Sequence, residues 1–157
     1  MNVYRPPTHS PRASRGHRSS VFLAGSIEMG TAERWQDKVT EALSDLDIDV
    51  FNPRRDDWDS SWVQSKDHPQ FREQVEWELE YLLDSAWVFM YFSPGTQSPI
   101  TLLELGLVAH LRGLVVVCPD GFWRQGNVDL VCERYRVPVY RTIDEGVLYL
   151  RSWLEEE

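Results

Sequence analysis

Long apolar runs are absent from this chain of 157 residues, and cysteine is scarce. The longest apolar runs, residues 86–92 and 114–118, are far shorter than the roughly 18 residues of a membrane-spanning helix, so we expect no membrane partner. The two cysteines, Cys118 and Cys132, form neither a metal motif nor a disulfide framework. Two buried thiols are typical of a reducing compartment, which predicts a cytoplasmic protein.

Several motifs that identify enzyme classes are also missing. The chain has no G-x-G-x-x-G fingerprint, no phosphate-binding loop with its lysine and no G-x-S-x-G elbow. Its four histidines stand far apart, without the spacing of metal ligands. We therefore expect neither a metal ion nor a cofactor.

The chain does carry a large negative charge, −9 in total, which is unevenly distributed. The first 20 residues contain four arginines and no acidic residue, so residues 21–157 carry −13. Such an acidic body disfavours a nucleic acid polymer and favours a small-molecule partner. Residues 1–20 also hold three prolines and lack the apolar core of a secretory signal, and we predict a basic, flexible extension there.

Residues 21–157 are long enough and apolar enough to form one domain with its own core. Short apolar segments alternate with stretches whose apolar residues recur at three- and four-residue spacing, as expected for strands and helices. This order predicts a three-layer α/β sandwich with a five-stranded parallel sheet. The predicted strands are 20–24, 48–51, 86–92, 114–118 and 137–140, and the predicted helices are 31–44, 70–84, 99–111, 127–135 and 143–154, the first capped by Thr31.

Ligands of such sheets bind beyond the carboxyl ends of the strands. This rule brings four segments to one edge, namely residues 25–30, 52–58, 92–104 and 119–127. In the first of them, Gly25 would let a ligand approach the backbone and Ser26 could contact a sugar hydroxyl. The alternative is a tight turn between strand and helix without a binding role.

A carboxylate stands in an apolar helix at Glu104, between leucines. Ser98, Thr101 and Glu104 are three residues apart and therefore share one face of this helix. A buried carboxylate without partners is costly, so Glu104 either faces solvent on a narrow polar stripe or belongs to a site. In a site, it could attack an anomeric carbon and form a glycosyl ester.

The preceding helix carries a run of acidic residues, of which one or two could reach the same edge. Most of this run, which comprises Glu73, Glu76, Glu78 and Glu80, is expected to be a solvated face. Two carboxylates from different helices that meet in one pocket would provide a nucleophile and a general acid.

Two further segments hold candidate binding residues. Residues 52–58 combine arginine with tryptophan, which could hydrogen-bond and stack on a base, or form a salt-bridged surface loop. Asn127 either caps the following helix or contacts a ligand.

Three segments together resemble the nucleoside 2-deoxyribosyltransferase-like superfamily, which includes the deoxynucleoside-monophosphate N-glycosidases. They are Phe-Leu-Ala-Gly-Ser-Ile at 22–27, Asn-Pro-Arg-Arg-Asp-Asp-Trp at 52–58 and Ser-Pro-Ile-Thr-Leu-Leu-Glu-Leu-Gly at 98–106. The resemblance covers residues 21–140 and implies a flavodoxin-like fold. It also implies that Glu104 is a nucleophile and that Glu78, with Glu80 as the next choice, acts near the leaving base.

The resemblance implies further binding residues. Ser98 matches a polar residue of the sugar pocket, and Asn127 resembles an asparagine that a neighbouring subunit contributes, which implies a homodimer or a higher homo-oligomer. Phe22 and Gly25 belong to the same pocket, beside Ser26 and Thr101. The base pocket would be shaped by Asn52, Arg54, Asp57 and Trp58.

Two positions depart from the family pattern. Phe22 stands where family members often have tyrosine, and Glu28 stands where the monophosphate hydrolases have arginine. A carboxylate at position 28 would repel a 5′-phosphate.

We therefore predict cleavage or transfer at the N-glycosidic bond of a (deoxy)nucleoside or nucleotide-like substrate, through a glycosyl ester of Glu104. The first alternative is a nucleotide-binding sensor that keeps the pocket without turnover, which Phe22 and Glu28 motivate. A flavin carrier is the second alternative, but the segment after the first strand lacks the serine- and threonine-rich cradle for a flavin phosphate.

Overall fold

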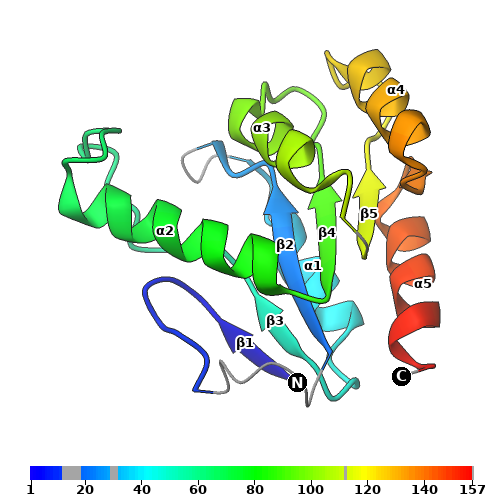
Figure 1. Cartoon of the computed structure of the whole chain (residues 1–157), viewed down its shortest axis with the longest axis horizontal. Helices are drawn as coiled ribbons and strands as arrows, with labels where there is room; N and C mark the ends of the chain where they lie inside the picture. Colours follow the sequence, from blue (N-terminus) through cyan, green and yellow to red (C-terminus); the bar gives the residue numbers. More distant parts are fainter. Residues whose placement is uncertain (12–18, 29–31, 112, 157) are drawn as a thin grey trace.

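The computed structural model describes residues 1–11, 19–28, 32–111 and 113–156 (Figure 1). The strands in this part of the chain are β1 (Asn2–Tyr4), β2 (Ser20–Gly25), β3 (Asp49–Phe51), β4 (Trp87–Tyr91), β5 (Leu114–Val117) and β6 (Val139–Tyr140). The helices are α1 (Trp35–Ala42), α2 (Pro69–Asp84), α3 (Pro99–Val108), α4 (Gln125–Tyr135) and α5 (Ile143–Leu154). Helix α1 is shorter than predicted, and Thr31, its predicted cap, lies outside the described residues. None of the described helices combines the length and apolar character that a bilayer crossing requires.

All six strands are parallel and form one sheet in the order β1-β3-β2-β4-β5-β6. The predicted parallel α/β sandwich of flavodoxin-like type is confirmed, but the prediction of five strands is wrong. The sixth strand, β1, pairs with the edge of β3, with Asn2 opposite Asp49, and it comes from the segment predicted as an extension. Three residues are too few to show the alternation by which a sequence reveals a strand.

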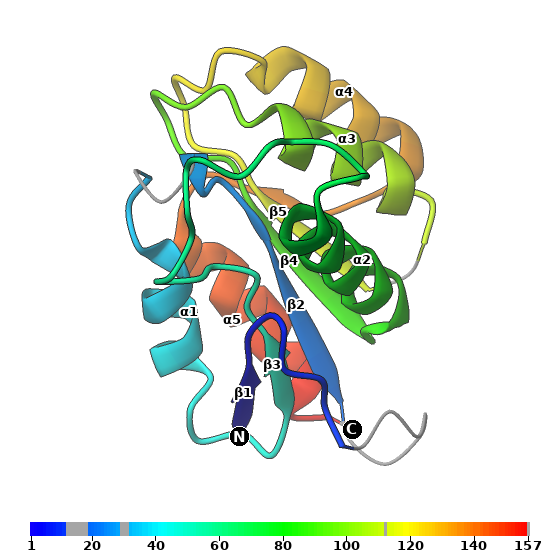
Figure 2. The ribbon, with the colours of Figure 1, turned by 90° about the vertical axis from the view of Figure 1, so that its left-hand side faces the viewer.

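Helices cover both faces of the sheet, with α2, α3 and α4 on one side and α1 and α5 on the other (Figure 2). Successive residues of β2 point to opposite faces, so Phe22 joins the core under α2 whereas Leu23 joins the core under α1 and α5. Because both faces are buried, the central strands are apolar throughout.

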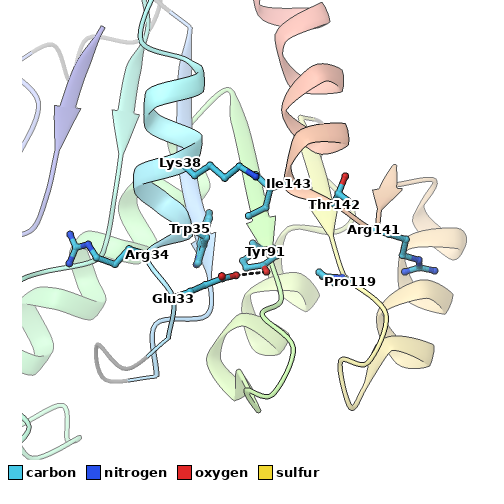
Figure 3. A pocket seen from close by; sticks show the side chains of 9 residues that line it. All are labelled: Glu33, Arg34, Trp35, Lys38, Tyr91, Pro119, Arg141, Thr142 and Ile143. Carbon is cyan, nitrogen blue, oxygen red and sulfur yellow. Dashed lines mark hydrogen bonds between the residues drawn. The ribbon is translucent and has the colours of Figure 1, made fainter.

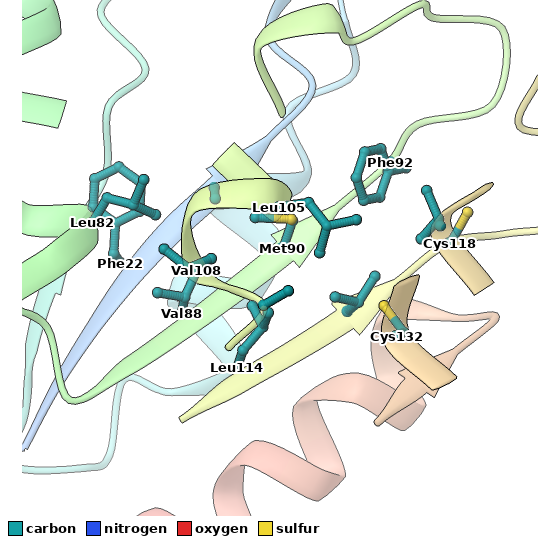
Figure 4. Packing of buried hydrophobic residues seen from close by; sticks show 14 of the residues in the cluster. Phe22, Leu82, Val88, Met90, Phe92, Leu105, Val108, Leu114, Cys118 and Cys132 are labelled. Carbon is teal, nitrogen blue, oxygen red and sulfur yellow. The ribbon is translucent and has the colours of Figure 1, made fainter. Parts of the chain in front are cut away.

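Figure 4 shows the core beneath α3, where Leu105 and Val108 lie near Met90 of β4. Cys118 and Cys132 belong to the same core, and burial raises the pKa of these thiols to about 11 and about 12. Both thiols therefore stay protonated near neutral pH and behave as small apolar side chains.

Residues 1–11 pack against α2, on the side away from α3. The indole nitrogen of Trp77 donates a hydrogen bond to the Thr8 carbonyl (2.9 Å), and the Ser10 amide donates to the Tyr81 hydroxyl (2.9 Å). Tyr81 also stacks on Phe51 of β3, with 3.9 Å between the ring centroids. These contacts tie the described part of the predicted extension to the helix and the sheet, while residues 12–18 of that extension lie outside the described residues.

Gly146 allows α5 to lie close to the sheet. A Cβ atom at this position would be 2.4 Å from Cγ2 of Val117 and 3.1 Å from Cε2 of Phe89. These separations are shorter than the contact distance of about 3.5–4.0 Å between carbon atoms. Gly126 in α4 is different, because nothing lies within 4 Å of its Cβ position.

We expect Gly146→Ala to lower the free energy of unfolding by about 1–3 kcal/mol, because α5 must move away from the sheet. The matched change Gly126→Ala should leave it unchanged or raise it by up to about 1 kcal/mol, because alanine is the better helix former. Urea unfolding of both variants and of the original chain measures the difference. Equal stability of the two variants would contradict the close packing of α5.

Candidate active site

Two glutamates from different helices come together on the α2 and α3 side of the sheet. Glu104 lies on the buried face of α3, with Thr101, and only 9% of it is exposed. Glu78 lies in α2 and is partly buried. The predicted face of Ser98, Thr101 and Glu104 is therefore an inward one, since all three side chains are buried.

Burial dominates the electrostatics of this pair. Burial and, to a smaller extent, the negative charge of Glu78 together raise the pKa of Glu104 to about 8. Burial also raises the pKa of Glu78 to about 7, against the opposing effect of a hydrogen bond from the Gln74 amide (2.7 Å). Two interacting carboxyl groups with such pKa values titrate as a unit, and near neutral pH they share one proton. One carboxylate and one carboxylic acid are thus available in the same place.

Hydroxyl groups gather where β2 and β4 end, beside the start of α3. The Ser26 hydroxyl accepts a hydrogen bond from the Ser93 amide (2.9 Å) and contacts the hydroxyls of Thr96 (3.1 Å) and Ser98. Thr96 also donates to the Ser93 carbonyl (2.8 Å). The predicted sugar contacts Ser26 and Ser98 therefore belong to one network, which joins the ends of the two central strands.

Glu28 is joined to this network at the start of α3. Its carboxylate accepts a hydrogen bond from the Ser98 amide (2.8 Å), at the residue that caps α3. The positive end of the α3 dipole is therefore already matched by a negative side chain. Both residues have a φ of 47°, a left-handed conformation that is uncommon for residues other than glycine and is kept where the surroundings hold it.

Two cavities lie along the carboxyl ends of the strands, and Glu33 and Tyr91 line both of them. The Tyr91 hydroxyl donates a hydrogen bond to the Glu33 carboxylate, as Figure 3 shows. The first cavity, of about 640 Å³, is next to the hydroxyl network and is lined by Glu28, Ala32, Glu33, Tyr91, Ser93, Pro94, Gly95 and Thr96. The second, of about 370 Å³, lies between α1 and α5 and is lined by Glu33, Arg34, Trp35, Lys38, Tyr91, Pro119, Arg141, Thr142 and Ile143.

Asn52 and Arg54, predicted to contact a base, hold the backbone before α1. The Arg54 guanidinium donates to the carbonyls of Ala32 and Glu33, both at 2.7 Å. The Asn52 side-chain oxygen accepts from the Arg54 amide (3.0 Å). These contacts stabilise the wall of the larger cavity, and a direct contact with a base stays a prediction for both residues.

The connection between β3 and α2 crosses from the α1 side of the sheet to the N-terminal end of α2 (Figure 2). Trp58, in this connection, packs edge-on against Trp62, with 5.0 Å between the centroids. Its buried indole nitrogen has no hydrogen-bond partner among the described residues. Asp57 is exposed and forms an ion pair with Arg55 (2.9 Å).

The other predicted site residues occupy three different settings. Phe22 is buried and packs against Trp77, with 6.3 Å between the ring centroids. Gly25 lies so close to the Tyr91 carbonyl that a Cβ atom would be 2.4 Å from it. Asn127 is exposed in the first turn of α4, so it does not cap that helix. No contact among the described residues brings Asn127 to the glutamates.

Sequence reasoning did not single out three polar residues that the structure brings to this region. Gln74 contacts Glu78, Thr96 belongs to the hydroxyl network, and Tyr91 contacts Glu33. The position of Gln74, one helical turn before Glu78, was a usable signal, because residues four apart on a helix are neighbours. Thr96 and Tyr91 lie in or next to segments that were already expected at the edge.

This geometry defines an α/β protein with a paired-carboxylate site at one edge of a parallel sheet. Residues 18–122, which include both glutamates, match the family described as nucleoside 2-deoxyribosyltransferase like. The match covers well over half of the chain, so the chain belongs to this family. A comparison with curated proteins returns no match. Membership supports glycosyl transfer on nucleosides as the general chemistry, and a small-molecule nucleoside as the partner.

The raised pKa of Glu104 leads to a prediction about stability. In the unfolded chain this pKa is near 4.5 and in the folded chain it is about 8, so the folded state binds more protons between these values. Stability is therefore lost as the pH rises from about 5 to about 8. We expect Glu104→Gln to reduce this loss by about 2 kcal/mol or more, as measured by urea unfolding at both ends of the range. An unchanged pH dependence would contradict the burial of an ionisable Glu104.

Proposed function

We propose that this protein cleaves or exchanges the N-glycosidic bond of an unphosphorylated (deoxy)nucleoside through a glycosyl ester of Glu104. The observation that supports this best is the pair formed by the buried Glu104 and the partly buried Glu78, whose pKa values of about 8 and about 7 let them hold one proton between them near neutral pH. Such a pair provides the nucleophile and the acid that glycosidic bond cleavage needs.

The shared proton rests mainly on Glu104, whose pKa is the higher of the two, and it passes to Glu78 before the first step. In that step, an oxygen of the resulting Glu104 carboxylate forms a bond to C1′ and the bond from C1′ to the base nitrogen breaks. The electron pair of that bond goes to the base, which takes the proton from Glu78. In the second step, the nitrogen of another base or a water molecule attacks C1′ and releases Glu104 as a carboxylate. The attacking group returns its proton to Glu78, so both steps balance.

The remaining predicted residues would bind the substrate. Ser26, Ser98 and Thr101 would hold sugar hydroxyls, and Trp58 would stack on the base. A second chain would add Asn127 in a homodimer or a higher homo-oligomer. The walls of the pocket would be formed by Phe22, Gly25, Asn52, Arg54 and Asp57.

The described lining of the larger cavity contains neither Glu78 nor Glu104, and the cavity lies beside the hydroxyl network, where it would receive the 5′ end of the sugar. Its charge then favours an unphosphorylated substrate. Its described lining includes the carboxylates of Glu28 and Glu33 and contains neither lysine nor arginine. A 5′-phosphate in this cavity would be repelled by both carboxylates and would meet no positively charged side chain in the described lining.

We expect Glu104→Gln to lower the rate of base release or base exchange by at least about a thousandfold, because the amide is a poor nucleophile. Chromatography of a panel of nucleosides and monophosphates, with and without a second base, measures the products. Mass spectrometry of the quenched original enzyme should find the mass of the sugar on the peptide that holds Glu104.

Glu133→Gln, a change of an exposed glutamate on α4, is the matched control and should keep full activity. A Glu104→Gln variant with undiminished turnover would exclude Glu104 as the nucleophile. Saturable nucleoside binding by the original chain without any product would instead support the nucleotide-binding sensor.

We expect Glu28→Gln to raise kcat/KM for a nucleoside monophosphate, relative to the nucleoside, by about five- to tenfold. The amide oxygen can still accept the hydrogen bond from Ser98, so mainly the charge is removed. Steady-state kinetics with both substrates measures the ratio. A ratio that stays the same would show that Glu28 does not select against phosphate.

A further inference from the structure

The amide of Gln74 makes three polar contacts at the centre of the site. Gln74 is 4% exposed and lies one turn before Glu78 on α2. Its nitrogen donates to the Pro53 carbonyl (3.0 Å) and to Oε1 of Glu78 (2.7 Å). Its oxygen accepts from the Arg55 guanidinium (3.4 Å). Every polar atom of this side chain is therefore used.

These contacts fix which way the amide faces. A backbone carbonyl can only accept a hydrogen bond, and a guanidinium can only donate. The Gln74 nitrogen must therefore face Pro53, and its oxygen must face Arg55. The second N–H of the amide then points at Glu78 and cannot be exchanged for an acceptor by a rotation of the amide.

We propose that Gln74 is a positioning residue for the reaction, which holds Oε1 of Glu78 so that Oε2 exchanges the proton with the leaving base. This inference rests on the proposed function. A bond donated to a carboxylate favours the charged form, and it opposes the burial of Glu78. Gln74 thus keeps Glu78 the more acidic member of the pair, ready to lose and regain its proton near neutral pH.

Among the described residues, none of the charged and titratable groups around Glu78 holds its Oε1 in the way that Gln74 does. Glu104 on α3 interacts with Glu78 through its charge, and repulsion between the two favours the protonated form. Arg55, from the connection before α2, reaches Glu78 only through the amide and is itself paired with Asp57. Gln74 is the one hydrogen-bond donor that the described residues direct at Glu78.

The same amide joins the acid to the predicted base pocket. Pro53 and Arg55 belong to the segment 52–58, and the Arg55 guanidinium lies over the Trp62 ring at 5.2 Å from its centroid. A base that moves this segment would therefore change the position of Gln74 and, through it, of Glu78. Base binding and placement of the proton donor would be coupled.

The test uses Gln74→Met, which keeps the length of the side chain but cannot donate. We expect the pKa of Glu78, measured by carboxyl ¹³C NMR titration, to rise by about one unit. The basic limb of the pH profile of kcat should move up with it. Because Oε1 of Glu78 is then no longer held, kcat at neutral pH should fall about tenfold even though more Glu78 is protonated, and KM should change little. Gln74→Asn, which keeps an amide but is one methylene shorter, should move the pKa in the same direction if the methionine variant does not fold.

Gln36→Met is the matched control, because Gln36 is an equally buried glutamine on α1, on the other face of the sheet. It should leave the pKa of Glu78 unchanged. If the folded Gln74 variants also leave this pKa unchanged, the inference is overturned. Absence of glycosyl chemistry in the original chain would overturn the proposed function instead. The two outcomes are distinguishable because the titration measures the effect of the Gln74 hydrogen bond on the pKa of Glu78 and needs no turnover.

Discussion

Desolvation of two carboxyl groups is the constraint around which this site is arranged. A glutamate that is buried on the apolar side of a sheet loses its hydration. This cost is offset either by a proton on the carboxyl group or by a hydrogen bond donated to the carboxylate. Glu104 shows the first response, with a pKa of about 8, and Glu78 shows the second, through Gln74. The difference between the two environments gives two identical side chains different tendencies to hold a proton. A site of this kind depends less on residue type than on which neighbour each carboxyl group has.

The fold supplies these environments through two helices on one face of the sheet. Helix α2 comes after β3 and helix α3 comes after β4, and each helix contributes one glutamate. The pair therefore forms only when both helices are packed on the sheet. The hydroxyl network adds a third tie, because Ser26 follows β2 whereas Ser93 and Thr96 follow β4. Both strands are buried and central, which makes their ends a rigid base for side chains that must keep fixed positions.

The sequence contained enough to predict the layers of the fold and one shared helix face for Ser98, Thr101 and Glu104, but not the surroundings of that face. The spacing of Ser98, Thr101 and Glu104 indicated one helix face, and the face proved to be buried. It could not reveal whether Arg54 points to a ligand or to backbone carbonyls, because an arginine in a loop fits either environment. β1 was missed for a related reason, since an edge strand of three residues leaves no periodic pattern. Local patterns describe an element, whereas the partner of a polar side chain is decided by segments far away in the chain.

The two edges of the sheet limit how copies of this protein can meet. One edge is β1, with three residues, and the other is β6, with two. Strands this short offer few free backbone groups, so another chain gains little by adding a strand of its own, and open-ended growth through the sheet is disfavoured. A lasting contact between copies would therefore depend on side chains at the surface of helices and connecting segments rather than on backbone hydrogen bonds between strands.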